Sequence, residues 1–193
     1  MKQMIAIVGR MASGKSTFLA ACAQLGYSTF NCDQYVSYLY SQDKEFIKLI
    51  AEKFGTFLLK DNVLDKSKIK KWILQDSTNL KKLEKEVFLK LKSHLLEHKY
   101  DFVEIPILYT DVVDFAPLFS CIFHMQISED IRQKFLQQKG VDNFTLQFLD
   151  NQNAYDWGIK KFFRKKKVVH ISLDKRDNIE KISKVLHELA IVR

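Results

Sequence analysis

Apolar residues along the chain form short buried runs separated by stretches with a helical period. Ile5–Val8 is an apolar run before a glycine, and Phe102–Ile105 is a second run that ends at Pro106. Apolar runs of this length, bounded by glycine or proline, are typical of buried strands. The other strands predicted in this way are Ser28–Asn31, Cys121–Ile127 and Val168–Ser172.

Between these runs, apolar residues recur every three to four positions, with lysine and glutamate on the opposite face. Strands that alternate with such helices predict an α/β fold with a parallel sheet and right-handed crossovers. A long helical excursion over residues 35–98 predicts a helical subdomain within one domain that spans residues 1–193. The predicted helices are Lys15–Leu25, Asp33–Tyr40, Lys44–Phe54, Lys66–Gln75, Asn79–His98, Glu129–Gln138, Thr145–Asn151 and Asn178–Leu189.

The composition is that of an ordinary globular chain, with 47% hydrophobic and 28% charged residues among 193. No apolar run approaches the ~20 residues that a membrane-spanning helix needs, so we expect no membrane partner. The cysteines Cys22, Cys32 and Cys121 have no metal-binding or disulfide pattern, which predicts free thiols in a reducing cytoplasm. His94 and His98 lie four residues apart on one predicted helix, but no third metal ligand is evident.

The net charge of +8 favours a polyanionic partner, either a nucleic acid or a phosphorylated small molecule. The chain has no RNA- or DNA-binding motif, which argues against nucleic acid as the main partner. Lysine supplies nearly all of the positive charge, because there are only five arginines. The densest basic run, Lys160–Lys167, is either a solvated face or a phosphate-facing segment.

One motif carries specific chemistry. The segment GRMASGKS, residues 9–16, fits the pattern G-x-x-x-x-G-K-[ST] and lies between a predicted strand and a predicted helix. The backbone N–H groups of such a loop and the N-terminus of the following helix bind phosphate oxygens. The nucleotide-binding residues predicted here are Gly9, Arg10, Met11, Ala12, Ser13, Gly14, Lys15, Ser16 and Thr17.

Within this phosphate loop, the side chains have different expected roles. Lys15 should reach the β- and γ-phosphates of ATP, and the hydroxyl of Ser16 should bind Mg²⁺. Thr17 supports the first helical turn. Arg10 either adds charge near the phosphates or points outward.

Two carboxylates are candidates for the acceptor side of the site. Asp33 follows the second predicted strand, and ligands of open parallel sheets bind beyond the carboxyl ends of strands. We favour Asp33 as the general base for an attacking hydroxyl, a role that is compatible with capping the next helix. Glu104 ends a buried strand and either holds a metal-bound water or plays a structural part.

The chain resembles the dephospho-coenzyme A kinase family of P-loop kinases. The phosphate loop and the segments LGYSTFNCDQY, FGTFLLKDNVLDKSKI and VEIPILY occur in that family's order and spacing. The resemblance extends to about Leu173. It implies a three-layer α/β P-loop kinase whose helical insertion binds the acceptor and whose lid spans about residues 129–165.

The resemblance also implies a reaction. ATP and Mg²⁺ would be held by Lys15 and Ser16, and Asp33 would be the general base. The acceptor would be the ribose 3′-hydroxyl of dephospho-coenzyme A, a small molecule, and the product coenzyme A.

Several positions depart from the family pattern. Asn31 replaces the first aspartate of an aspartate-x-aspartate pair, and Lys85-Glu86 stand where the family has histidine-proline. The usual lid arginines fall near Lys134 and Gln138, and a further arginine falls on Tyr155. Arg132 or Lys139 would compensate for the arginine lost at Gln138, and Lys160, Lys161 or Arg164 for the one lost at Tyr155.

These departures leave two alternatives open: a kinase with another nucleoside or nucleotide acceptor, and an ATP-binding protein without transferase activity. The sequence does not decide between ATP and GTP, nor the oligomeric state.

Overall fold

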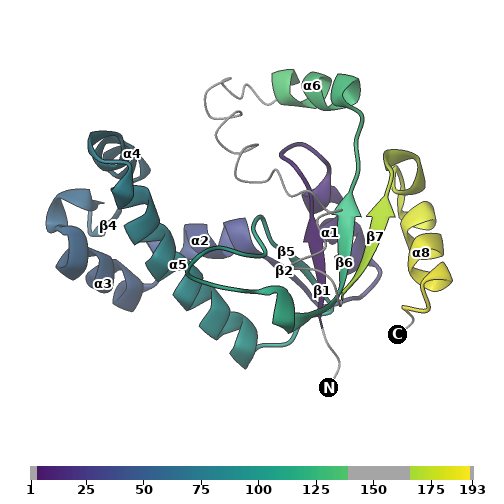
Figure 1. The fold of residues 1–193 in the computed structure, drawn as a ribbon, viewed down its shortest axis with the longest axis horizontal. Coiled ribbons are helices and arrows are strands. Elements are labelled where there is room, and N and C mark those ends of the chain that lie inside the picture. Colours follow the sequence, from purple (N-terminus) through teal and green to yellow (C-terminus); the bar gives the residue numbers. More distant parts are fainter. Residues whose placement is uncertain (1–3, 139–165, 192–193) are drawn as a thin grey trace. The chain divides into compact units, whose positions relative to one another are not determined.

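The structure is a computed structural model that describes residues 4–138 and 166–191. Its main sheet has five parallel strands in the order β2-β5-β1-β6-β7 (Figure 1). The predicted fold class, a parallel sheet flanked by helices, is confirmed. The strands are β1 (Met4–Val8), β2 (Thr29–Asn31), β5 (Phe102–Glu104), β6 (Phe119–Met125) and β7 (Lys167–Ile171).

The described part of the chain divides into two compact units. The first, the sheet unit, comprises residues up to 31, 98–109 and those from 114 onward. It contains helices α1 (Lys15–Gln24), α6 (Glu129–Gln138) and α8 (Ile179–Glu188), with short 3₁₀ helices η2 (Ala116–Leu118) and η3 (Leu173–Lys175).

The core of the sheet unit lies where α1 and α8 pack on one face of the sheet. Ile5 and Ile7 alternate along β1 and therefore point to the same face. They pack with the rings of Phe18, Phe102 and Phe123, which meet edge to face or tilted at 6.0–6.4 Å between centroids. This core supports the strands β1, β5 and β6. The candidate site lies at the carboxyl ends of these strands.

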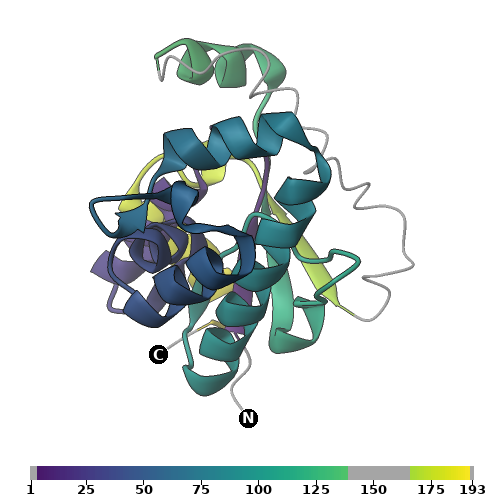
Figure 2. The ribbon, with the colours of Figure 1, turned by 90° about the vertical axis from the view of Figure 1, so that its left-hand side faces the viewer.

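The second unit, the helical unit, comprises residues 32–97 and 110–113 (Figure 2). It contains α2 (Cys32–Ser41), α3 (Lys44–Phe54), η1 (Thr56–Leu58), α4 (Lys66–Gln75) and α5 (Thr78–Glu97), with the hairpin strands β3 (Leu59–Lys60) and β4 (Val63–Leu64). Asp43 and Asp65 cap α3 and α4, because their side chains accept hydrogen bonds from the backbone N–H groups of Phe46 and Lys68 at 2.9 Å.

Local signals predict most of these bounds. The helices α3, α4 and α6 begin and end at the predicted residues, and the other predicted elements that the structure describes differ from prediction by one or two residues at an end. The hairpin β3–β4 was not predicted, because two residues per strand are too few to show alternation. The predicted helix Thr145–Asn151 and most of the basic run Lys160–Lys167 lie outside the described residues.

The three cysteines are free thiols, as predicted; Cys22 and Cys32 are buried, whereas Cys121 is half-buried. Helix α5 ends before His98, and the described residues contain no cluster of three or more potential metal-ligating side chains. Within the same ranges, no helix is both long and apolar enough to cross a bilayer.

Candidate active site

The phosphate loop connects β1 to α1 and has the backbone geometry that its glycines allow. Gly9 and Gly14 have positive φ angles of 149° and 82°, and Ala12 adopts a left-handed conformation at φ 62°. A Cβ atom on Gly9 would lie 2.7 Å from Ser13 Oγ and 2.9 Å from the carbonyl of Met125. The close packing of the loop on the end of β6 therefore excludes any larger residue at position 9.

Lys15, the first residue of α1, folds its side chain back over the loop. Its Nζ donates to the backbone carbonyls of Gly9 at 3.0 Å and Arg10 at 3.2 Å. The first turn of α1 contains no acidic residue, so no carboxylate within that turn neutralises the positive end of the helix dipole. The ammonium group and the helix N-terminus together favour an anion at the loop.

Ser13 contributes a buried polar atom that no described residue satisfies with a hydrogen bond. Its residue is 1% exposed, and Oγ has no hydrogen-bond partner among the residues that the structure describes. A buried hydroxyl of this kind costs free energy unless a ligand or water pairs with it. The loop therefore offers a hydrogen-bonding group to a bound molecule.

Glu104 joins three elements at the carboxyl ends of the strands. Its Oε1 accepts a hydrogen bond from Ser16 Oγ at 3.1 Å, and its Oε2 accepts one from Asn31 Nδ2 at 2.8 Å. In the sheet, β5 lies between β2 and β1, and Asn31 of β2 is the register partner of Glu104 of β5. Glu104 is 3% exposed, so the two side-chain donors stabilise a buried carboxylate.

The hydrogen bond to Glu104 explains why an asparagine is suitable at position 31. An aspartate at position 31 would place a second carboxylate next to Glu104, whereas the amide of Asn31 donates to it. The pairing of Ser16, Asn31 and Glu104 was not predicted, because the residues are 73 and 88 positions apart in the chain.

Asp33 lies in the first turn of α2, in the helical unit. Its side chain is exposed, and it follows the end of β2 by two residues. A carboxylate in the first turn also stabilises the positive end of the helix dipole.

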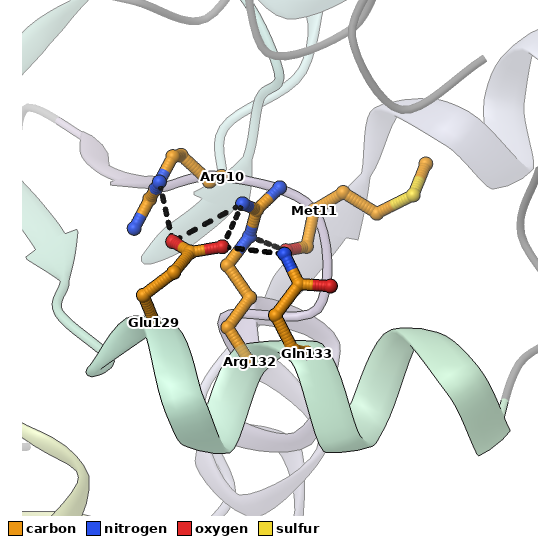
Figure 3. A network of polar contacts seen from close by, with 5 residues as sticks. All are labelled: Arg10, Met11, Glu129, Arg132 and Gln133. Carbon is orange, nitrogen blue, oxygen red and sulfur yellow. Dashed lines mark hydrogen bonds and ion pairs between the residues drawn. The ribbon is translucent and has the colours of Figure 1, made fainter. Parts of the chain in front are cut away.

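Arginines surround the phosphate loop, as the close-up in Figure 3 shows for two of them. Arg132 on α6 is 1% exposed; its Nε donates to the carbonyl of Met11 at 3.0 Å and its Nη1 to Glu129 at 3.1 Å. Arg10 forms an ion pair with Glu129 at 2.9 Å, so it does not simply point outward. The hydrogen bond from Gln133 and the charges of Arg132 and Arg10 lower the pKa of Glu129.

A third arginine lies behind the loop. Arg176, just after η3, is 4% exposed and donates from Nη2 to the carbonyl of Gln126 at 2.8 Å and from Nε to that of Ile171 at 3.3 Å. Its Nη1 would lie 2.5 Å from a Cβ atom at Gly14. All the arginines within residues 4–138 and 166–191 thus lie at the loop. The scarcity of arginine in a lysine-rich chain was the sequence feature that could have marked these residues as functional.

A cavity of about 760 Å³ opens beside Arg10 at the carboxyl ends of β6 and β7. His124 in its wall is the register partner of His170, and their Nδ1 atoms are 3.0 Å apart, so one ring donates to the other. Burial, together with the nearby charges of His170 and Arg10, lowers the pKa of His124 to about 4. The polar and charged residues around the cavity are Arg10, His124, Gln126, Ser128, Ser172, Asp174 and Asp177.

The helical unit has a separate cavity of about 470 Å³ between α2 and α5. Tyr35 stacks with Tyr38 at 6.1 Å and lies tilted against His94 at 4.4 Å between ring centroids. Lys90 and Asp43 form an ion pair of 3.3 Å at its edge. Aromatic faces flanked by charges can hold a flat polar ring.

The positions that depart from the expected family pattern are partly visible. Lys134 and Gln138 are exposed on α6, and Lys85 is exposed on α5, where Glu86 forms an ion pair with Lys53 at 2.8 Å. The cation of α6 that contacts the loop is therefore Arg132. Tyr155 and the candidate compensating residues Lys139, Lys160, Lys161 and Arg164 lie outside the described residues.

A phosphate loop at the carboxyl edge of a five-stranded parallel sheet defines the fold as that of a P-loop kinase. Solved structures agree: a Thermus thermophilus protein aligns with a TM-score of 0.66 over 98% of this chain and 96% of its own, at 19% identity. A Campylobacter jejuni dephospho-CoA kinase aligns at 0.55 over 98% of both chains and 18% identity. A shikimate kinase of Bacteroides thetaiotaomicron aligns at 0.52 over 97% and 98%, at 13% identity.

The sequence matches the family model for dephospho-CoA kinase over residues 3–147. The chain belongs to the dephospho-CoA kinase family. It is 31% identical over 140 residues to the dephospho-CoA kinase of Rickettsia bellii, which is 67% of this chain and 68% of the relative. It is 27% identical over 117 residues to that of Helicobacter pylori, but this match covers only 56% of this chain and 58% of the relative.

Proposed function

We propose that this protein transfers the γ-phosphoryl group of ATP to the ribose 3′-hydroxyl of dephospho-coenzyme A and so forms coenzyme A. The observation that supports this function best is the phosphate loop joined to Glu104 through Ser16, in a chain of the dephospho-CoA kinase family. In the reaction, the bond from the γ-phosphorus to its bridging oxygen breaks and a bond to the 3′-oxygen forms. The products are ADP and coenzyme A.

The loop residues would bind and orient the triphosphate. Lys15 already lies over the loop through Gly9 and Arg10, and on binding it would exchange these carbonyls for phosphate oxygens. The Ser13 hydroxyl and the N-terminus of α1 offer further donors. Catalysis of this kind rests on positioning and charge neutralisation.

Ser16 and Glu104 provide the kind of oxygen ligands that suit Mg²⁺. One hydroxyl and one carboxylate, 3.1 Å apart, fit an ion that keeps several waters and binds substrate phosphates. When bound, Mg²⁺ would neutralise charge on the phosphates.

Asp33 is the proposed general base. Its carboxylate would accept the proton of the 3′-hydroxyl as the oxygen attacks. The connection from β2 places it two residues beyond Asn31, which itself contacts Glu104. The cavity beside Arg10 has a volume that suits a nucleoside, so we assign the adenosine of ATP to it.

The test is an ADP-release assay with ATP, Mg²⁺ and dephospho-coenzyme A, with coenzyme A identified by mass. We expect coenzyme A at a rate well above the acceptor-free control. ATP binding without product would refute the proposed acceptor, and a screen of nucleosides and nucleotides would then distinguish another kinase from a protein that does not transfer phosphate. The same assay with GTP measures the preference for the donor.

A further inference from the structure

Arg176 combines deep burial with a formal charge. Its guanidinium hydrogen-bonds to the carbonyls of Gln126 and Ile171, which lie at the carboxyl ends of β6 and β7. The side chain therefore ties two adjacent strands together just behind the phosphate loop. Ile171 O also accepts a hydrogen bond from the backbone N–H of Gln126, so Arg176 joins an existing backbone link.

The partners of Arg176 are neutral. Each hydrogen bond ends on a backbone carbonyl, and no ion pair within the described ranges includes this residue. Burial lowers the pKa of the guanidinium, because removal from water disfavours the charged form. An arginine nevertheless stays protonated in proteins, and a buried charge that only dipoles compensate favours a nearby anion.

The loop determines where that anion can lie. Nη1 of Arg176 occupies the space that a side chain at Gly14 would need. Gly14 is the N-cap of α1 and immediately precedes Lys15. The buried charge is therefore adjacent to the backbone turn that aims N–H groups at a phosphate, and the low local dielectric leaves it poorly screened.

We propose that Arg176 is a positioning residue for phosphate binding, with the bound phosphates as the counter-charge for its buried guanidinium. This inference rests on the proposed function, since it concerns the same phosphate site. If Arg176 has this role, position 14 needs glycine for two reasons: its backbone is left-handed, and Arg176 occupies the space that a Cβ atom would take. The same role also explains why an arginine stands in a segment where the neighbouring cation, Lys175, is exposed.

The experiment compares R176Q, R176K and the control K175Q by calorimetric titration with inorganic tripolyphosphate and by thermal unfolding with and without it. R176Q removes the charge but keeps an N–H donor for a carbonyl. We expect R176Q to bind tripolyphosphate about tenfold more weakly or worse, because an unscreened charge near the phosphates is lost. R176K should stay within about threefold of the wild type, and K175Q, which loses an exposed charge, within about twofold.

A structural clamp predicts a different pattern. R176Q would then unfold at a lower temperature without ligand but show the wild-type affinity, and this result would overturn the proposal. If R176Q does not fold, R176K is measured in its place: a tenfold loss of affinity in a folded R176K, which keeps the charge, overturns the proposal. Tripolyphosphate needs no acceptor, so a wild type that binds it but makes no coenzyme A refutes the proposed reaction and leaves this test intact.

Discussion

The two units bury polar side chains very differently. In the sheet unit, Ser13, Glu104, Arg132 and Arg176 are all nearly inaccessible, and each lies in the phosphate loop or next to it. In the described residues of the helical unit, Asn79 alone is a buried polar residue; it links α4 to α5 by donating to the carbonyl of Trp72. The helical unit otherwise has an apolar core, which includes Leu39, Phe46, Ile50, Leu58 and Leu83.

The difference shows that the free-energy cost of burying polar groups is concentrated at the phosphate loop. Burying a polar or charged group is unfavourable unless it finds partners, and such groups concentrate where binding or catalysis needs them. Among the charged pairs of the helical unit, Lys48 with Glu52 lies at the surface, where an ion pair contributes little. Apart from Asp33, substitutions in the two units should therefore affect different quantities, activity in the sheet unit and stability in the helical unit.

The largest expected effect is that of K15A. Removing the ammonium group that lies over the loop should lower ATP turnover by on the order of 10³-fold, because this group neutralises charge on the transferred phosphate. The ADP-release assay measures this loss. K48A, which removes an exposed lysine of the helical unit, is the control and should retain full turnover; full activity of K15A would show that the loop is not the site.

D33N tests the one proposed catalytic residue of the helical unit. Transfer should fall by roughly 10²-fold or more, since an amide cannot accept the proton. ATP affinity, measured by titration, should not change. D61N is the matched control, because Asp61 lies in the hairpin turn at φ 51°, a conformation that asparagine also adopts. Equal transfer by D33N would exclude Asp33 as the base.

E104Q should have a smaller effect, on metal dependence. The Mg²⁺ concentration for half-maximal turnover should rise about tenfold, because the carboxylate near Ser16 is replaced by a neutral amide. The comparison is with E97Q, an exposed glutamate of α5 that accepts a hydrogen bond from Ser93. An unchanged Mg²⁺ requirement would limit Glu104 to holding Ser16 and Asn31.

K53M should have the smallest effect on turnover and should confirm that stability and activity separate between the units. It removes the partner of Glu86, whose side chain is only 11% exposed although that of Lys53 is 45% exposed, so the free energy of unfolding should fall by roughly 1–3 kcal/mol while turnover is unchanged. Urea unfolding measures the change, with K48M as a second surface variant. A large loss of turnover in K53M would contradict the division of activity and stability between the two units.

Much of the fold follows from the sequence because its signals are local. The helical period and the caps at Asp43 and Asp65 determine α3 and α4 within the segment itself. The phosphate loop is also local: eight consecutive residues between a strand and a helix carry the whole motif. Torsion angles and short-range hydrogen bonds depend on neighbouring residues, so such features can be recognised in a single chain.

Only the tertiary structure decided how the rest of the site is assembled. Asn31 meets Glu104 because β2 and β5 are neighbours in register, and Arg132 reaches Met11 across 121 residues of sequence. The sequence suggested Glu104 and Arg132 as candidates but did not show what they contact, and beyond the scarcity of arginine it gave no sign of a role for Arg176. Contacts of this kind depend on strand order, register and side-chain packing, which are properties of the folded chain and have no local signature.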